Sequence, residues 1–96
     1  MTKTELQKQR VKAVLEFLTD QFDAQIEDAD GGRLDITIGE FNGQIMRRDL
    51  YVELWDSIPL HGHGFTPAEI IHHKTAVEFE KQINAEINRV LGELSI

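Results

Sequence analysis

The sequence predicts a single small α+β domain, in which two antiparallel helices pack on one face of a β-hairpin. Two long segments have apolar residues at three- and four-residue spacing, and each begins with a helix-capping pattern. Two stretches of alternating apolar and polar residues lie between them. The chain has 96 residues, 41% of them hydrophobic and 28% charged, which fits one two-layer α-β-β-α domain with one core.

The first element is expected to be a helix over about residues 3–28. Thr2 and Glu5 fit a capping box, in which the threonine hydroxyl accepts a hydrogen bond from a free backbone amide. Gly31 and Gly32 are expected to end the helix, because glycine readily adopts the left-handed conformation found there. The apolar residues of this segment form one stripe: Val11, Val14, Leu15, Leu18, Phe22 and Ile26.

Charge is distributed unevenly along this expected helix. Residues 1–12 contain four basic residues and one acid, whereas residues 13–31 contain six acids and no base. Basic residues at the start of a helix and acidic residues at its end are opposite to the arrangement that the helix dipole favours. A basic group near residues 20–30 would offset this cost. The candidates within the chain are Arg33, Arg47 and Arg48.

Two strands are expected next, over about residues 33–40 and 46–55. Apolar residues alternate with polar ones in both, as in strands with one buried face. The residues expected on the buried face are Leu34, Ile36, Ile38, Leu50, Val52 and Leu54.

The dipeptide Asn42-Gly43 is a typical hairpin turn and is expected to connect these strands. If Gly43 is a bulge residue after the turn, Leu34 lies opposite Leu50 and both apolar sets share one face. The same register places Ile38 opposite Met46. A bulge near Arg47-Arg48 is an alternative way to bring the two apolar sets together.

A loop over residues 56–66 is expected to lead into a second helix over about residues 67–91. Thr66, Pro67 and Glu69 form a clear start signal, with an N-cap hydroxyl, a proline in the first turn and a capping-box glutamate. The apolar stripe of this helix comprises Ala76, Phe79, Ile83, Ile87, Val90 and Leu94.

Composition excludes several classes of protein. The chain has no cysteine, which excludes disulfides, thiolate metal sites and a cysteine nucleophile. Its 17 acidic and 10 basic residues give a formal charge of −7, which argues against nucleic acid or an anionic membrane as the partner. No apolar run approaches the ~20 residues of a membrane span, and the first residues lack the apolar segment of a signal peptide. We therefore expect a cytoplasmic protein.

No catalytic or cofactor site is expected. Ser57, Asp56 and His61 are close in sequence but lack a nucleophile elbow, and there is no glycine-rich phosphate loop. A domain this thin also leaves little room for a substrate cavity. The sequence thus argues against an enzyme and against a small-molecule ligand.

Four histidines raise the alternative of weak transition-metal binding. His61 and His63 are two residues apart in the loop, and such a pair could share a metal ion. His72 and His73 are adjacent on the expected helix and point about 100° apart, so only one of them could face a shared ion. A solvated loop is the simpler interpretation of His61 and His63, so no metal site is assigned.

The remaining candidate surface is the outer face of the hairpin. Alternation directs Arg47, Tyr51, Glu53 and Trp55 away from the core, and tyrosine and tryptophan are enriched at interface centres. These residues favour a non-enzymatic protein-interaction module that binds a protein partner or a second copy of itself through the hairpin. In the alternative, the loop over residues 56–66 folds back and covers Tyr51 and Trp55.

The two strand segments also carry a resemblance. The resemblance lies in residues 34–39, with the sequence LDITIG, followed by residues 49–55, with the sequence DLYVELW. In these segments the chain resembles small bacterial proteins in a family of unknown function. The chain is also similar in size and acidity to bacterial secretion chaperones, which have more strands. Neither resemblance implies an activity or a set of site residues.

Overall fold

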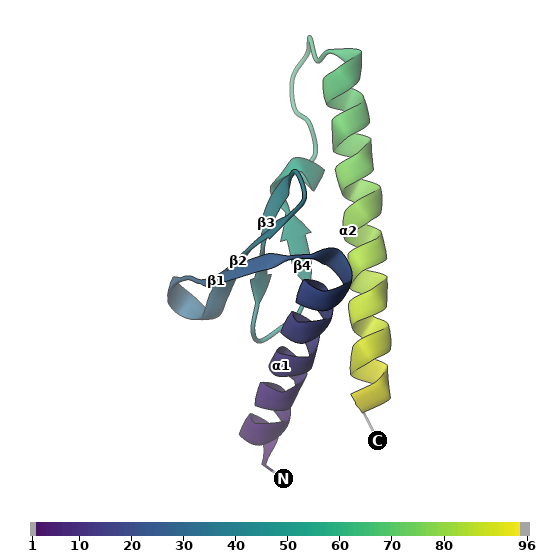
Figure 1. The fold of residues 1–96 in the computed structure, drawn as a ribbon. Coiled ribbons are helices and arrows are strands. Elements are labelled where there is room, and N and C mark those ends of the chain that lie inside the picture. Colours follow the sequence, from purple (N-terminus) through teal and green to yellow (C-terminus); the bar gives the residue numbers. More distant parts are fainter. Residues whose placement is uncertain (1, 95–96) are drawn as a thin grey trace.

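A computed structural model describes residues 2–94 as two long helices and a four-stranded antiparallel sheet (Figure 1). The strands lie in the order β1–β2–β3–β4, so each pairs with its neighbour in sequence. The protein is therefore α+β, as predicted, with four strands in place of two. The elements in chain order are α1 (Lys3–Phe22), β1 (Gln25–Asp28), the 3₁₀ helix η1 (Asp30–Gly32), β2 (Arg33–Ile38), β3 (Phe41–Met46), β4 (Val52–Leu54), the 3₁₀ helix η2 (Trp55–Ser57) and α2 (Pro67–Leu94).

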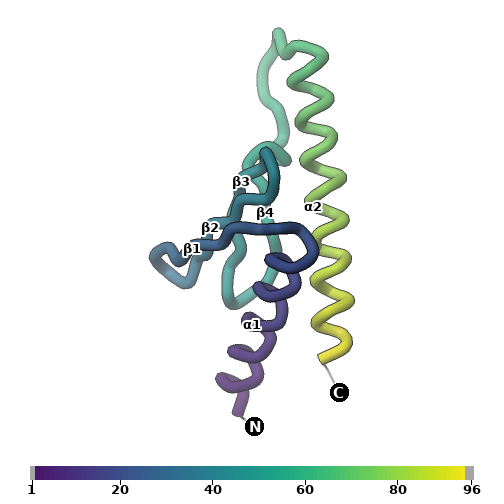
Figure 2. Tube along the Cα trace, in the orientation of Figure 1, coloured from purple at the N-terminus to yellow at the C-terminus, as the bar shows by residue number. Residues whose placement is uncertain are grey.

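The molecule is elongated, with extents of 53 × 27 × 21 Å. Its long dimension follows α2, because a helix of 28 residues extends about 42 Å at 1.5 Å per residue. The two helices contact each other and run in opposite directions, so both ends of the described chain lie at one end of the molecule (Figures 1 and 2). At the other end, the loop over residues 58–66 and the first turns of α2 extend past the sheet (Figure 2).

The first helix is shorter than predicted and ends at Phe22. Asp23 adopts the left-handed conformation with φ of 53°, and the amide of Ala24 donates a hydrogen bond to the carbonyl of Leu18. The predicted helical residues 25–28 instead form β1, where Ile26 pairs with Ile36 of β2. The prediction failed because the position of Ile26 fits the apolar spacing of the helix and also the buried face of a strand.

The predicted turn at Asn42-Gly43 is also wrong. The chain turns at Gly39 and Glu40, and Gly39 has φ of +60°, as expected for the first central position of a type II′ turn. Both residues of the predicted turn lie within β3. The observed pairs are Leu34–Ile45, Ile36–Gly43 and Ile38–Phe41, so the expected pairs Leu34–Leu50 and Ile38–Met46 do not form.

The predicted strand over residues 46–55 is divided between two strands. A turn over residues 47–49 follows β3, and the chain then re-enters the sheet as β4 (Val52–Leu54), with Val52 opposite Ile45. Leu50 has a left-handed φ of 51° and its amide donates to the carbonyl of Met46 across this turn. Where the alternative prediction placed a bulge near Arg47-Arg48, the chain reverses direction completely.

Both predicted helix starts are confirmed. In α1 the hydroxyl of Thr2 accepts a hydrogen bond from the amide of Glu5. In α2 the capping box is reciprocal: the amide of Glu69 donates to the hydroxyl of Thr66, and the amide of Thr66 donates to the carboxylate of Glu69. α2 continues to Leu94, three residues beyond the predicted end.

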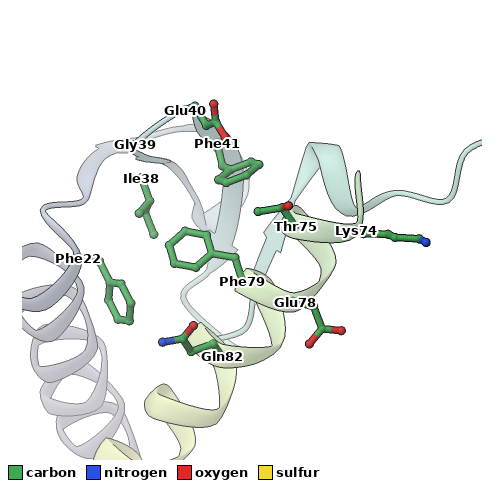
Figure 3. Close-up of a pocket in the computed structure, with 10 residues that line it drawn as sticks. All are labelled: Phe22, Ile38, Gly39, Glu40, Phe41, Lys74, Thr75, Glu78, Phe79 and Gln82. Carbon is green, nitrogen blue, oxygen red and sulfur yellow. The ribbon is translucent and has the colours of Figure 1, made fainter. Parts of the chain in front are cut away.

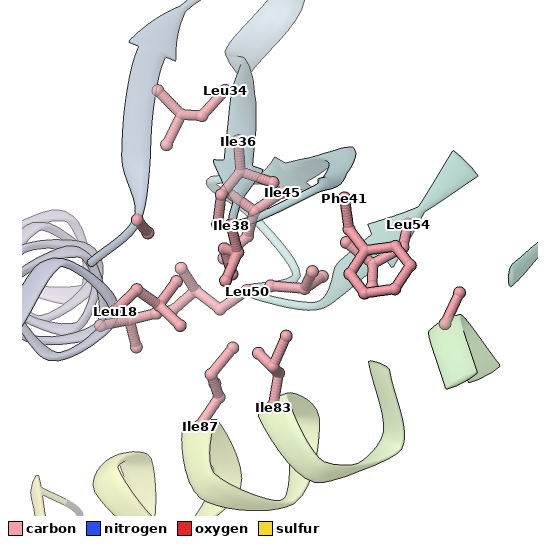
Figure 4. Packing of buried hydrophobic residues seen from close by; sticks show 14 residues of the cluster. Leu18, Leu34, Ile36, Ile38, Phe41, Ile45, Leu50, Leu54, Ile83 and Ile87 are labelled. Atoms are coloured by element: carbon pink, nitrogen blue, oxygen red, sulfur yellow. The ribbon is translucent and has the colours of Figure 1, made fainter. Parts of the chain in front are cut away.

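One hydrophobic cluster joins the two helices to the sheet (Figure 4). Alternate residues of β2 and β3 are buried, so the sheet contributes side chains from one face. The buried hydrophobic residues are Val14, Leu18, Ala24, Leu34, Ile36, Ile38, Phe41, Ile45, Leu50, Val52, Leu54, Ala76, Ile83 and Ile87. This packing confirms the predicted buried face of β2. Five residues of the predicted helix stripes are buried, whereas Leu94 is 37% exposed.

The two edges of the sheet differ. At the β4 edge, Asn84 of α2 accepts from the amide of Val52 at 2.8 Å and donates to its carbonyl at 2.9 Å. The carboxylate of Glu80 accepts from the amide of Leu54 at 2.7 Å. These polar side chains occupy the place of a further strand and close this edge.

The β1 edge is open by comparison. The amide of Ala29 donates to the carbonyl of Arg33, and hydrogen-bonded positions alternate along an antiparallel pair. The backbone groups of Ile26 and Asp28 therefore point away from β2. This edge carries acidic side chains, including Glu27.

Candidate interaction site

The face of the sheet opposite the core is polar. Several of its polar side chains pair with one another across neighbouring strands or along one strand. The pairs are Thr37–Asn42 at 2.9 Å, Gln44–Glu53 at 3.3 Å and Arg33–Asp35 at 3.3 Å. Glu53, one of the predicted interface residues, therefore has a partner within the chain.

The other predicted interface residues are dispersed. Arg47 lies in the turn after β3, forms an ion pair with Asp28, and accepts at its carbonyl from the side chain of Gln7 in α1. Tyr51, just before β4, is 55% exposed. Trp55, 43% exposed, begins η2 at the opposite end of β4. Arg47 and Trp55 line two different grooves.

Trp55 lines a groove between η2, the following loop and the start of α2. The groove has a volume of about 500 Å³. Two neighbouring loop residues, Ile58 and Leu60, contribute apolar side chains that remain 49% and 40% exposed. The complete lining comprises Trp55, Asp56, Ile58, Leu60, Ala68, Glu69, His72 and His73. We call this the Trp55 groove.

Asp56 fixes one wall of the Trp55 groove to the other. Its carboxylate lies 3.0 Å from Nε2 of His72, and its backbone carbonyl accepts a hydrogen bond from Nδ1 of His73 at 2.9 Å. The His72 ring also stacks on Phe41, with 5.0 Å between ring centroids, and its Nδ1 lies 3.8 Å from Glu40. Through these contacts, both histidines of α2 hold η2 against the helix.

A second groove lies between the end of α1, the β2–β3 turn and α2 (Figure 3). Its floor is aromatic: the Phe79 ring packs edge-on against Phe22, with 5.9 Å between centroids, and lies tilted against Phe41, with 5.7 Å between centroids. Lys74 and Glu78 point away from these rings (Figure 3). The aromatic residues extend the core to this end of the sheet, and Phe41 links them to His72.

The loop histidines and Ser57 are the residues that the sequence raised for metal binding and for a nucleophile. His61 and His63 are exposed in the loop, and the described part of the chain has no cluster of three histidine, aspartate or glutamate side chains that could hold a metal ion. The hydroxyl oxygen of Ser57 lies 2.8 Å from the carbonyl of Leu54 and 2.8 Å from the carboxylate of Glu80, and its one proton can be donated to either acceptor. Ser57 therefore closes the turn after β4 and is not paired with a histidine.

Trp55 was predicted to lie on the outer hairpin face. The loop over residues 56–66, which contains Ile58, Leu60 and Phe65, was expected only as a possible cover for that face. In the structure, Ile58 and Leu60 line the groove beside Trp55 and leave the indole partly exposed. Three apolar residues in a loop rich in glycine, proline and histidine were the available signal, because a solvated loop has no need of them.

No helix within residues 2–94 combines the length and the apolar character needed to cross a membrane. Comparison of the chain with protein-family models, curated proteins and solved structures finds no significant match.

Proposed function

We propose that this protein is a small, non-enzymatic, cytoplasmic module that binds another protein in the Trp55 groove. One observation carries the proposal: Trp55, Ile58 and Leu60 remain 43%, 49% and 40% exposed around a single groove. Exposed apolar side chains scattered singly are normal, whereas a group of them marks a binding surface. Tryptophan is also among the residues most enriched at the centres of interfaces.

The distribution of exposed apolar residues supports this choice of surface. Eight large hydrophobic side chains of residues 2–94 are exposed, and five of them lie between Trp55 and Ile71. Most of this segment, the loop over residues 58–66 and the first turns of α2, extends past the sheet (Figure 1). We take both helices to cover the same face of the sheet. α2 continues beyond the sheet, and the Trp55 groove lies at this extension, where a partner can reach it.

The charge of the groove defines the chemistry of the partner. Asp56 and Glu69 contribute carboxylates to its lining, and the whole chain carries a formal charge of −7. A segment with one apolar anchor flanked by lysine or arginine would complement both features. Complementary charge raises the association rate and rejects acidic competitors.

A pair of matched peptide libraries tests this proposal. Each peptide has one apolar anchor, flanked by lysine and arginine in the first library and by aspartate and glutamate in the second. Trp55 is the only tryptophan, so its fluorescence reports on the groove alone. We expect peptides of the basic library to shift Trp55 emission to the blue with saturable binding and the acidic library to leave it unchanged. Absence of saturable binding by either library would contradict the proposal.

Trp55→Ala is expected to weaken binding of the best basic peptide at least tenfold, which corresponds to about 1.4 kcal/mol, measured by anisotropy of a labelled peptide. The same change should lower the free energy of unfolding by only about 1 kcal/mol, well below the ~3–5 kcal/mol of a core aromatic truncation, because the indole is partly exposed. Tyr51→Ala is the matched control, since Tyr51 is an exposed aromatic residue outside the groove. Unchanged peptide affinity in Trp55→Ala would place binding elsewhere.

A further inference from the structure

The charges on the exposed side of α1 follow a pattern that complements a second copy of the same pattern running in the opposite direction. Lys8, Lys12, Glu16 and Asp20 are four residues apart, so they follow one row along the helix surface. All four are exposed. The first two are basic and the last two acidic, and the row changes sign at its midpoint between Lys12 and Glu16.

These four charges are not used within the chain. The ion pairs of residues 2–94 involve none of the four side chains. Their order along α1 also opposes the helix dipole, which favours acids at the start and bases at the end. The isolated chain therefore keeps an arrangement of charges that brings it no stabilisation.

We propose that α1 binds antiparallel to α1 of a second copy of this chain. A two-fold axis at the midpoint of the row places Lys8 opposite Asp20 and Lys12 opposite Glu16, and symmetry repeats both pairs. The basic start of each helix then lies beside the acidic end of the other. The same contact corrects the unfavourable charge order of both helices.

An amphipathic groove beside the row can receive the second helix. Its basic end is lined by Lys3, Lys8 and Lys12 with Val11 and Leu15 between them. It continues along α1 toward an acidic end, because a second groove shares Leu15, Glu16 and Arg47 with the first. This acidic end includes Asp20 and Asp28. The groove thus has the same change of sign as the row of exposed charges.

A second copy fits this surface better than other partners do. A nucleic acid or an acidic helix would attract the two lysines but would be repelled by Glu16 and Asp20. Self-association through the sheet is also disfavoured, because the β4 edge is closed by Asn84 and Glu80. Two antiparallel β1 edges would bring the acidic side chains of both copies together.

Sedimentation equilibrium of the full chain tests this inference with two charge-reversal variants. The first, Lys8→Glu with Lys12→Glu, has an entirely acidic row, and the second, Glu16→Lys with Asp20→Lys, has an entirely basic row. We expect wild type to self-associate and each variant to remain monomeric alone. An equimolar mixture of the two variants should form a heterodimer, because every pair in the row is then attractive.

Two features make the outcome decisive. Each variant gives one end of α1 the charges that the helix dipole favours there, and circular dichroism checks that α1 remains folded in both. Glu78→Lys with Lys81→Glu exchanges an exposed pair on α2 and should leave self-association unchanged. Raising salt from about 0.05 M to about 0.5 M should weaken wild-type association roughly tenfold by screening.

A wild-type chain that stays monomeric up to about 1 mM at low salt would overturn the inference. So would self-association of either variant alone, or a mixture of the two variants that remains monomeric. Each result is independent of the Trp55 groove, which no substituted residue lines.

Discussion

Replacing Gly43 with alanine is expected to lower the free energy of unfolding by about 3 kcal/mol, measured by urea denaturation. A Cβ atom at this position would lie 2.2 Å from the carbonyl oxygen of Glu53 and 2.9 Å from Cα of Leu54. Both atoms belong to the backbone of β4, so no flexible side chain can move aside. The whole strand would have to shift, and Leu54 and Val52 are fully buried core residues.

Gly92→Ala is the matched control for this prediction. Gly92 lies in α2, and an added Cβ would meet nothing within 4 Å. Alanine is favoured over glycine in a helix, so this change should raise stability by about 0.5 kcal/mol. If Gly43→Ala and Gly92→Ala had the same effect, the close approach of β3 and β4 would be wrong.

Gly43 also shows why the sheet could not be predicted in full. Asn-Gly is the strongest local turn signal, and in this sequence Asn42-Gly43 lies close to a second possible turn residue, Gly39. The structure uses Gly39 for the turn and Gly43 for the approach of a strand that comes ten residues later. The second requirement depends on a non-local contact, which no local pattern records.

The helices were predictable because their signals are local. Apolar spacing and a capping box both act within one or two turns, and the start of α2 at Pro67 followed directly from Thr66 and Glu69. β1 gave no such signal. It has four residues, and its hydrogen bonds come from β2, so its sequence alone could not distinguish it from the last turn of a helix.

The candidate groove was predictable only in part. Trp55 was predicted to be a contact residue from its size and from its outward-facing position in an alternating strand. Its neighbours Ala68 and His72 come from a helix that begins more than ten residues later. The groove forms because Asp56 binds both His72 and His73, and that contact has no signature in sequence spacing.

Asn84 is the second position where a large effect is expected. Asn84→Leu should lower the free energy of unfolding by about 3 kcal/mol, although leucine has a similar volume and suits a buried position. Asn84 is the buried polar residue of the described chain, and its amide group satisfies both the N–H and the C=O of Val52. Leucine would leave these two backbone groups without partners in the core, at a cost of about 1–3 kcal/mol each.

The matched control is Asn88→Leu, one turn later on α2, where the asparagine is exposed and a change within about 0.5 kcal/mol is expected. Hydrogen exchange adds a local measurement, because the amide of Val52 should lose protection in Asn84→Leu at low denaturant before the core of β2 does. Asn84→Asp separates the two hydrogen bonds: the carboxylate still accepts from the amide of Val52 but cannot donate to its carbonyl. If Asn84→Leu were as stable as Asn88→Leu, the hydrogen bonds from α2 would not stabilise the β4 edge. That edge would then be open to pairing with a further strand.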